Sequence, residues 1–154
     1  MSHAPLAKYP LAFTADQTRL LKVYLERLAK RTSSTQVMLA DVSGRLVLSF
    51  GTLAARQSVE LAAIAAGSFA AGIEIYNFLG VSKGQQFDQL LYEGDPINIL
   101  TTQIDGELLL VIVFFESAKI GSAQIYADQV CAEISKLVEV AIASRQKRRE
   151  LETQ

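Results

Sequence analysis

The segment from Val59 to Leu79 constrains the fold more than any other part of the sequence, because it is apolar on nearly all sides. Its strongly polar side chains are Glu60, Ser68, Glu74 and Asn77. An ordinary surface helix has one apolar stripe and a polar opposite face. We therefore predict a helix that starts at a Ser58 cap, stops at Gly80 and is covered on more than one side.

Small residues dominate the same segment. They are Ala62, Ala63, Ala65, Ala66, Gly67, Ala70, Ala71 and Gly72. One interpretation is a shallow surface for self-association or docking, with a symmetric dimer as the commonest arrangement. The other is a tight crossing inside the fold, where each glycine costs about 1 kcal/mol relative to alanine in a helix. The sequence leaves both interpretations open.

The remaining pattern predicts an α+β domain in the order helix, two strands, helix, three strands, helix. A Thr14 and Gln17 capping box opens a helix over 15–31, and a third helix covers 123–141. The predicted strands are 37–40, 46–50, 87–93, 97–105 and 107–115. Because helices and strands do not alternate strictly, we predict a five-stranded antiparallel sheet covered on both faces. The run 108–115, apolar throughout, should be its central strand.

Length and charge limit the classes of function. The 154 residues suit a single domain over 15–144, with flexible or frayed tails at 1–14 and 145–154. A formal net charge of -1 argues against nucleic-acid binding. The longest uncharged run, 61–73, is shorter than the roughly 20 residues that span a bilayer, so no membrane insertion is predicted. One cysteine and a start unlike a signal peptide favour a cytoplasmic location.

The strand 87–93 is the second candidate for self-association. It is apolar and bounded by loops, so at a sheet edge it would invite pairing with another copy. The residues that we assign to this predicted dimer edge are Phe87, Gln89, Leu91 and Tyr92. The alternative is an edge blunted by Asp88 and Glu93 or covered by a loop.

The sequence contains no recognisable catalytic, cofactor or metal site. The sole histidine, His3, lies near the chain start, and Cys131 suits a small buried position in the third helix. Gly80, Lys83 and Gly84 lack the order of a phosphate-binding loop. Carboxylates at strand ends are explained by turn formation; they are Asp41, Asp105 and Glu107. The basic cluster 145–149 could contact a membrane or an acidic partner, but it also suits the C-terminal end of a helix dipole.

Three stretches carry a resemblance to a known family. VMLADVSGRLVLSFG, ELAAIAAGSFAAGIEIYNFLG and LLLVIVFFESAKIG, in this order and spacing, resemble the roadblock/dynein-light-chain family, and within it the bacterial MglB-type regulators of polarity and gliding motility. The resemblance covers residues 15–142. It implies a sheet with the central helix on one face and the terminal helices on the other. It also implies a homodimer with paired central helices and sheets joined edge to edge.

The resemblance further implies a partner, a small Ras-like GTPase of the MglA type, which docks on the paired helices and hydrolyses GTP faster. By position, the residues on or near that platform are Ala63, Ala66, Gly67, Ala70 and Glu74. Glu74 departs from the small residue expected there. Arg45 and Arg56 are the loop arginines available as a catalytic finger, but MglB-type activation implies remodelling of the GTPase, so neither need be catalytic.

Two other functions stay open. A structural scaffold or light chain would dimerise in the same way without changing GTP turnover. A ligand sensor would need a concave pocket with convergent polar groups.

Overall fold

The computed structural model describes residues 10–80 and 87–153, and their elements follow the predicted order. The helices are α2 (Ala15–Thr32), α3 (Ala55–Phe78) and α4 (Ile120–Glu152), with a short 3-10 turn, η1 (Ser117–Lys119), before α4. The strands are β1 (Gln36–Asp41), β2 (Leu46–Gly51), β3 (Gln89–Tyr92), β4 (Asn98–Ile104) and β5 (Leu108–Phe114). His3, Lys83 and Gly84 lie outside the described residues.

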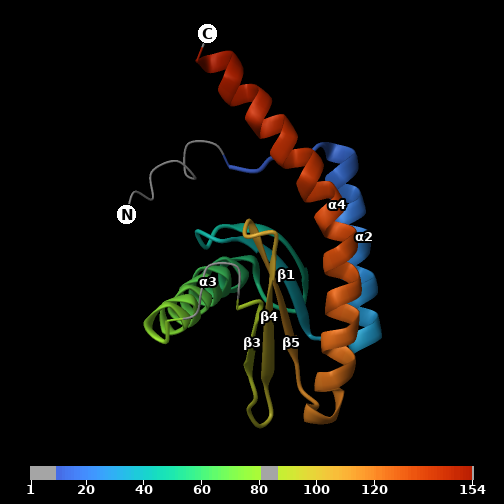
Figure 1. Ribbon diagram of the computed structural model, residues 1–154. Coiled ribbons are helices and arrows are strands. Elements are labelled where there is room, and N and C mark those ends of the chain that lie inside the picture. Colours follow the sequence, from blue (N-terminus) through green and yellow to red (C-terminus); the bar gives the residue numbers. More distant parts are fainter. Residues whose placement is uncertain (1–9, 81–86, 154) are drawn as a thin grey trace.

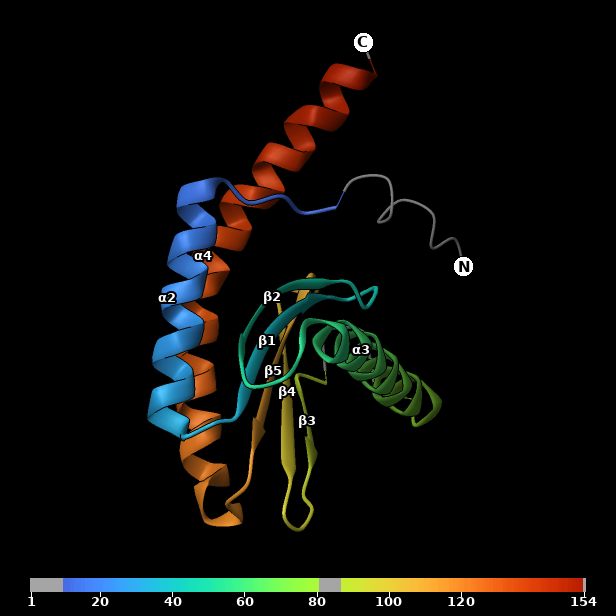
Figure 2. The same cartoon turned by 180° about the vertical axis from the view of Figure 1, so that it is seen from behind.

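The strands form one antiparallel sheet in the order β2-β1-β5-β4-β3. Helix α3 covers one face, and α2 and α4 cover the other (Figures 1 and 2). The predicted fold class and the central place of β5 are therefore confirmed. The apolar run of β5 follows from this layering, because Leu110 and Ile112 face the α2/α4 side while Leu109 and Val111 face α3.

The two faces of the sheet are packed differently. On the α2/α4 side, Leu21, Leu25 and Leu28 form one helical stripe and are fully buried, and burying each such side chain stabilises the fold by about 1.5–3 kcal/mol. On the α3 side, the helix contributes mainly alanines to the core. The small side chains let α3 lie close to the sheet.

Helix α2 begins as predicted, whereas α3 does not. The Thr14 hydroxyl accepts from the Gln17 amide at 3.1 Å, and the Gln17 side chain accepts from the Thr14 amide at 2.8 Å. The predicted Ser58 cap is wrong, because α3 starts at Ala55, where the Gln57 side chain accepts from the Ala54 amide at 3.3 Å. Ser58 falls on the buried stripe of the helix, and its hydroxyl lies 3.4 Å from Nε2 of Gln36.

Helix α4 is longer than predicted. We expected residues 145–154 to fray, whereas α4 continues to Glu152 and extends past the sheet (Figure 1). Arg145 is buried and forms two hydrogen bonds with Glu107. Arg148 also donates to the carbonyl of Pro10 at 3.4 Å, and the segment 10–14 packs Leu11 and Phe13 on the α2/α4 core. The predictions for 1–9 and 154 lie outside the described residues.

Candidate functional site

Helix α3 has a short buried stripe and a long exposed surface. The buried residues are Ser58, Ala62, Ala65, Ala66 and Phe69. The same stripe continues at helical spacing to Ile73 and Tyr76, yet each of these is 38% exposed. No residue of α3 beyond Phe69 is buried. The last turns of α3 therefore extend beyond the sheet, and their inner side is only partly covered.

Four of the five residues predicted for the platform lie on the exposed side of α3. Ala63, Gly67, Ala70 and Glu74 follow one another at helical spacing and are all exposed. A Cβ placed on Gly67 would meet no atom within 4 Å. Ala66 differs, because it is 5% exposed and packs against Phe69 and Leu109 on the sheet side. Ala66 therefore supports the helix from beneath and is not available on the surface.

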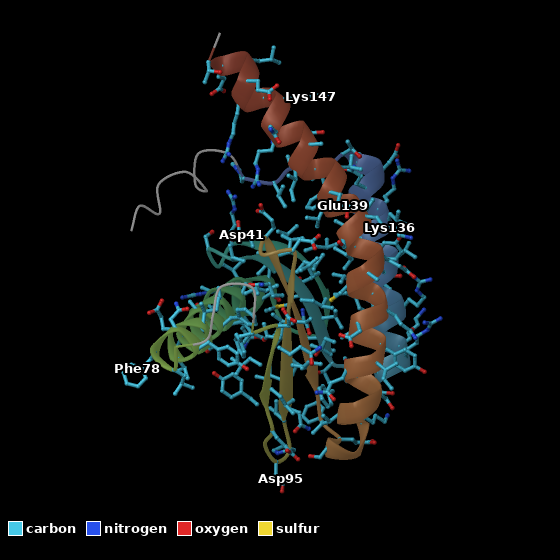
Figure 3. The ribbon with its side chains drawn as sticks, viewed as in Figure 1. Asp41, Phe78, Asp95, Lys136, Glu139 and Lys147 are labelled. Atoms are coloured by element: carbon cyan, nitrogen blue, oxygen red, sulfur yellow. The ribbon has the colours of Figure 1, made fainter. Side chains whose placement is uncertain are left out.

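Large apolar side chains flank this exposed stripe. They are Val59, Ile64, Ile75, Phe78 and Leu79, all more than half exposed. Phe78 lies at the free end of α3, is 89% exposed and projects outward from the helix (Figure 3). Several large exposed apolar side chains on one helix are a feature of interaction sites in many proteins. We name the exposed side of α3 over residues 59–79 the α3 face.

Strand β3 is at the sheet edge, as the prediction of edge pairing requires. The Asp88 carbonyl accepts from the Gln103 amide at 2.9 Å, so Asp88, Leu90 and Tyr92 direct their backbone groups toward β4. By the alternation of an antiparallel ladder, the backbone groups of Gln89 and Leu91 point to the open side. These two residues therefore offer the donors and acceptors for another strand.

The side chains of β3 alternate between the two layers. Leu91 packs on the α2/α4 core, while Leu90 packs on the α3 side. Tyr92, two residues after Leu90, lies on the α3 side and is exposed. Nε2 of Gln89 donates to the Thr102 hydroxyl at 3.3 Å and to Oδ1 of Asp128 at 3.2 Å.

The other predicted features of this edge are placed as follows. Phe87 precedes the strand, and its side chain lies against α3. Its part in edge pairing stays a prediction. The predicted blunting residues Asp88 and Glu93 are exposed next to the two ends of β3. Whether their charges oppose pairing stays a prediction.

The β1–β2 turn lies beside the α3 face. Gly44 has φ +99°, and a Cβ placed on it would come within 3.1 Å of the Ala63 Cα. Glycine suits this position because it adopts the positive φ and because it leaves room for the close approach of α3. The Asp41 carboxylate accepts from the amide and hydroxyl of Ser43 and from the amide and Nε of Arg45. Burial raises the pKa of Asp41, but these hydrogen bonds and the Arg45 charge together lower it below the ordinary value of 3.8.

Replacing Asp41 by asparagine should reduce stability at neutral pH by about 1 kcal/mol, because the turn loses charge-assisted hydrogen bonds. Since the folded-state pKa lies below the unfolded value, the carboxylate stabilises the fold above pH 3.8 and loses this effect as the pH falls through the lower value. Urea unfolding of both proteins at several pH values measures the difference. A difference that did not shrink in acid would contradict this account.

The two arginines considered as catalytic fingers are both exposed and already paired. Nε of Arg45 lies 3.2 Å from Oδ2 of Asp41. Arg56 is in the first turn of α3, so its predicted loop position is wrong, and its Nε lies 3.2 Å from Oε1 of Glu60. The error follows from the earlier start of α3.

Cys131 has the environment of a structural residue. Burial, followed by the charges of Asp128 and Asp105, raises the pKa of its thiol to about 12. A protonated thiol is a poor nucleophile. Within residues 10–80 and 87–153, no three His, Cys, Asp or Glu side chains are grouped so that they could hold a metal ion.

The Roadblock/LC7 domain family model matches residues 20–114, which include α3, β3 and the whole sheet. The chain belongs to the Roadblock/LC7 domain family. This assignment confirms the resemblance found in the sequence. A search of curated proteins finds no match.

Solved structures resemble this Roadblock/LC7 chain in fold. Myxococcus xanthus MglB has a TM-score of 0.72 at 23% identity, covering 79% of this chain and 96% of its own. The gliding protein MglB of Thermus thermophilus has a TM-score of 0.72 at 21% identity, covering 84% and 96%. A Roadblock/LC7 domain from Streptomyces avermitilis has a TM-score of 0.70 at 16% identity, covering 76% and 96%. At these identities the likeness concerns the fold alone.

Length and composition alone would also allow α3 of this Roadblock/LC7 chain to cross a membrane. A helix that packs on the sheet of a globular domain meets the same criterion, and α3 packs on its sheet through five buried residues. The absence of membrane insertion stays a prediction.

Proposed function

We propose that this Roadblock/LC7 protein is a homodimer that binds a small Ras-like GTPase of the MglA type and stimulates its GTP hydrolysis by conformational control. The observation that carries the proposal is the α3 face, a long apolar surface lined by small residues. A second copy and a GTPase together would cover it. In this proposal the protein lends no catalytic group to the GTPase.

The dimer part of the proposal rests on two surfaces that lie together. Pairing of β3 with its copy would use the open backbone groups of Gln89 and Leu91 and join the two sheets. It would also bring the overhanging end of α3 near the α3 side of the partner's sheet, where Tyr92 is exposed. Ile73 and Tyr76 would then be buried, completing the stripe that the single chain leaves open. A related structure described as MglB with tetrameric arrangement supports self-association in this fold.

The GTPase part rests on the resemblance and on the shape of the α3 face. Gly67 and Ala70 present no bulk, so a partner backbone can approach closely. Glu74 adds a negative charge in the same stripe. A desolvated carboxylate needs a cation or hydrogen bonds from its partner. We therefore expect the docked GTPase to place a basic or hydrogen-bonding group opposite Glu74.

Conformational control is proposed because neither candidate arginine is preorganised to enter an active site. Each forms an ion pair with an acidic residue four positions away on its own surface segment. Such exposed pairs are weak, about 0.2–1 kcal/mol. Both arginine side chains are therefore solvated, and neither is held in a position from which it would reach a GTPase active site.

The double variant Arg45→Ala, Arg56→Ala should therefore stimulate GTP hydrolysis to within about twofold of the unaltered protein. Loss of a catalytic arginine finger would lower the stimulated rate by about 1,000-fold or more. Single-turnover hydrolysis at saturating regulator measures the difference. Abolished stimulation, with the dimer mass unchanged, would overturn conformational control.

The proposal as a whole is tested by phosphate release from a GTP-loaded Ras-like GTPase of the same organism, with and without this protein. Light scattering gives the mass of the mixture. Faster release with a complex larger than the dimer supports the proposal. A complex without acceleration would overturn the stimulation and favour the scaffold function. If no complex forms, the proposal of a GTPase partner is wrong.

A further inference from the structure

The side chain of Phe87 is the contact between the start of β3 and the overhanging part of α3. Its ring lies directly on Gly72, because a Cβ placed on that glycine would come within 2.6 and 2.7 Å of the Phe87 Cε1 and Cζ atoms. The ring centroid is 4.6 Å from that of Phe69 and 5.3 Å from that of Tyr76. Such distances are typical of favourable aromatic pairs.

These three helix residues make a hole for the ring. Phe69, Gly72 and Tyr76 are spaced by three and four positions, so they lie on one side of α3. The glycine forms the floor and the two aromatic rings form the walls. Phe69 is the last buried residue of α3, so Gly72 and Tyr76 belong to the part of the helix that the sheet does not hold. Phe87 is thus placed to fix the direction of that part.

We propose that Phe87 is a positioning residue that sets the last turns of α3 relative to the β3 edge, so that helix and edge are presented to other molecules as one surface. The consequence for assembly rests on the proposed function. The positioning itself concerns the single chain. It also assigns Gly72 a role, because any side chain there would displace the ring.

The two glycines of α3 provide a matched comparison. Gly67 and Gly72 lie five residues apart in one helix, and replacing either by alanine raises the intrinsic preference for helix by about fivefold. A Cβ at Gly67 meets no atom within 4 Å, whereas at Gly72 it meets the Phe87 ring. At Gly72, alanine would therefore favour the helix but displace the Phe87 ring, so the two effects on helix stability oppose each other. At Gly67, only the gain in helix preference remains.

Hydrogen exchange in the full chain tests the positioning role. For Gly72→Ala we expect exchange of the amides of residues 73–79 to rise about tenfold, while those of β1 and β5 stay unchanged. For Gly67→Ala we expect equal or slower exchange. Equal behaviour of the two variants over 73–79 would overturn the proposal.

A compensating variant distinguishes ring displacement from general damage. Leucine lacks the two atoms of Phe87 that approach Gly72 most closely, so Gly72→Ala combined with Phe87→Leu should bring exchange over 73–79 back to within about threefold of the unaltered protein. Additive effects of the two substitutions would overturn the proposal, because they would show that the ring and the added methyl group do not conflict.

Light scattering of the same variants tests the link to assembly. We expect Gly72→Ala to weaken the dimer affinity at least tenfold. Any change in dimer affinity for Gly67→Ala would come from the added methyl group on the α3 face, without faster exchange over 73–79. Faster exchange with an unchanged dimer constant for Gly72→Ala would overturn the coupling of helix and edge. If the unaltered protein is monomeric and binds no GTPase, the proposed function fails, while the exchange result still decides the positioning role.

Discussion

Replacing Ala70 by arginine should leave the chain folded and convert the proposed dimer to a monomer of 16.8 kDa. Ala70 is exposed on the α3 face, so a long side chain meets no obstacle within one chain. Between two closely paired helices, the same side chain would separate the backbones and bring a charge into an apolar contact. We expect the dimer affinity to fall about 100-fold or more, which corresponds to about 2.7 kcal/mol.

Two matched substitutions make this result specific. Ala143→Arg places the same side chain on an exposed position of α4 and should keep the dimer, whereas Ala66→Arg forces it into the core and should unfold the chain. Circular dichroism and light scattering separate the three cases. If Ala70→Arg unfolds, Ala70 is part of an internal crossing. An unchanged dimer would remove α3 from the interface.

Replacing Arg145 by methionine should destabilise the chain by about 3 kcal/mol, because it leaves the Glu107 carboxylate, only 16% exposed, without its partner. Nη1 and Nη2 of Arg145 donate to the two carboxylate oxygens of Glu107 at 3.0 and 2.5 Å. The pair also borders a cavity of about 300 Å³ between α4, the β1–β2 turn and the segment 10–13. Urea unfolding measures the loss.

The double substitution to methionine at positions 145 and 107 should recover most of that stability, since removing both charges also removes the burial penalty. The comparison of single and double variants separates the ion pair from the packing of the arginine stem. If the single variant is as stable as the unaltered protein, the extension of α4 past the sheet is held by other contacts.

Helix caps and hydrophobic patterns predicted those features of the fold that depend on neighbouring residues. The Thr14 and Gln17 box started α2 where expected, because both hydrogen bonds form within one turn. The apolar run of β5 predicted a strand covered on both faces. Ser58 shows the limit of such rules, since the same hydroxyl suits a cap or a buried contact, and the contact with Gln36 on β1 is visible only in the folded chain.

The candidate site was predicted in outline. The composition of 59–79 indicated a helix with more apolar surface than one sheet can cover, and the exposed α3 face agrees with that interpretation. It could not show that Ala66 faces inward while Ala63 faces outward. The sequence pattern assigned Phe87 to the sheet edge and could not show that its ring lies on Gly72, because no periodicity links a helix residue to a residue just before a strand.

The sequence by itself determined the elements, their order and the family, because these follow from periodicity, caps and turns over a few neighbouring residues. The tertiary structure decided which side of α3 is free, where its support ends and how far α4 extends. Each of these depends on contacts between residues far apart in the chain, such as Phe87 with Gly72 and Arg145 with Glu107. Their strength is set by burial and geometry that only the assembled layers create.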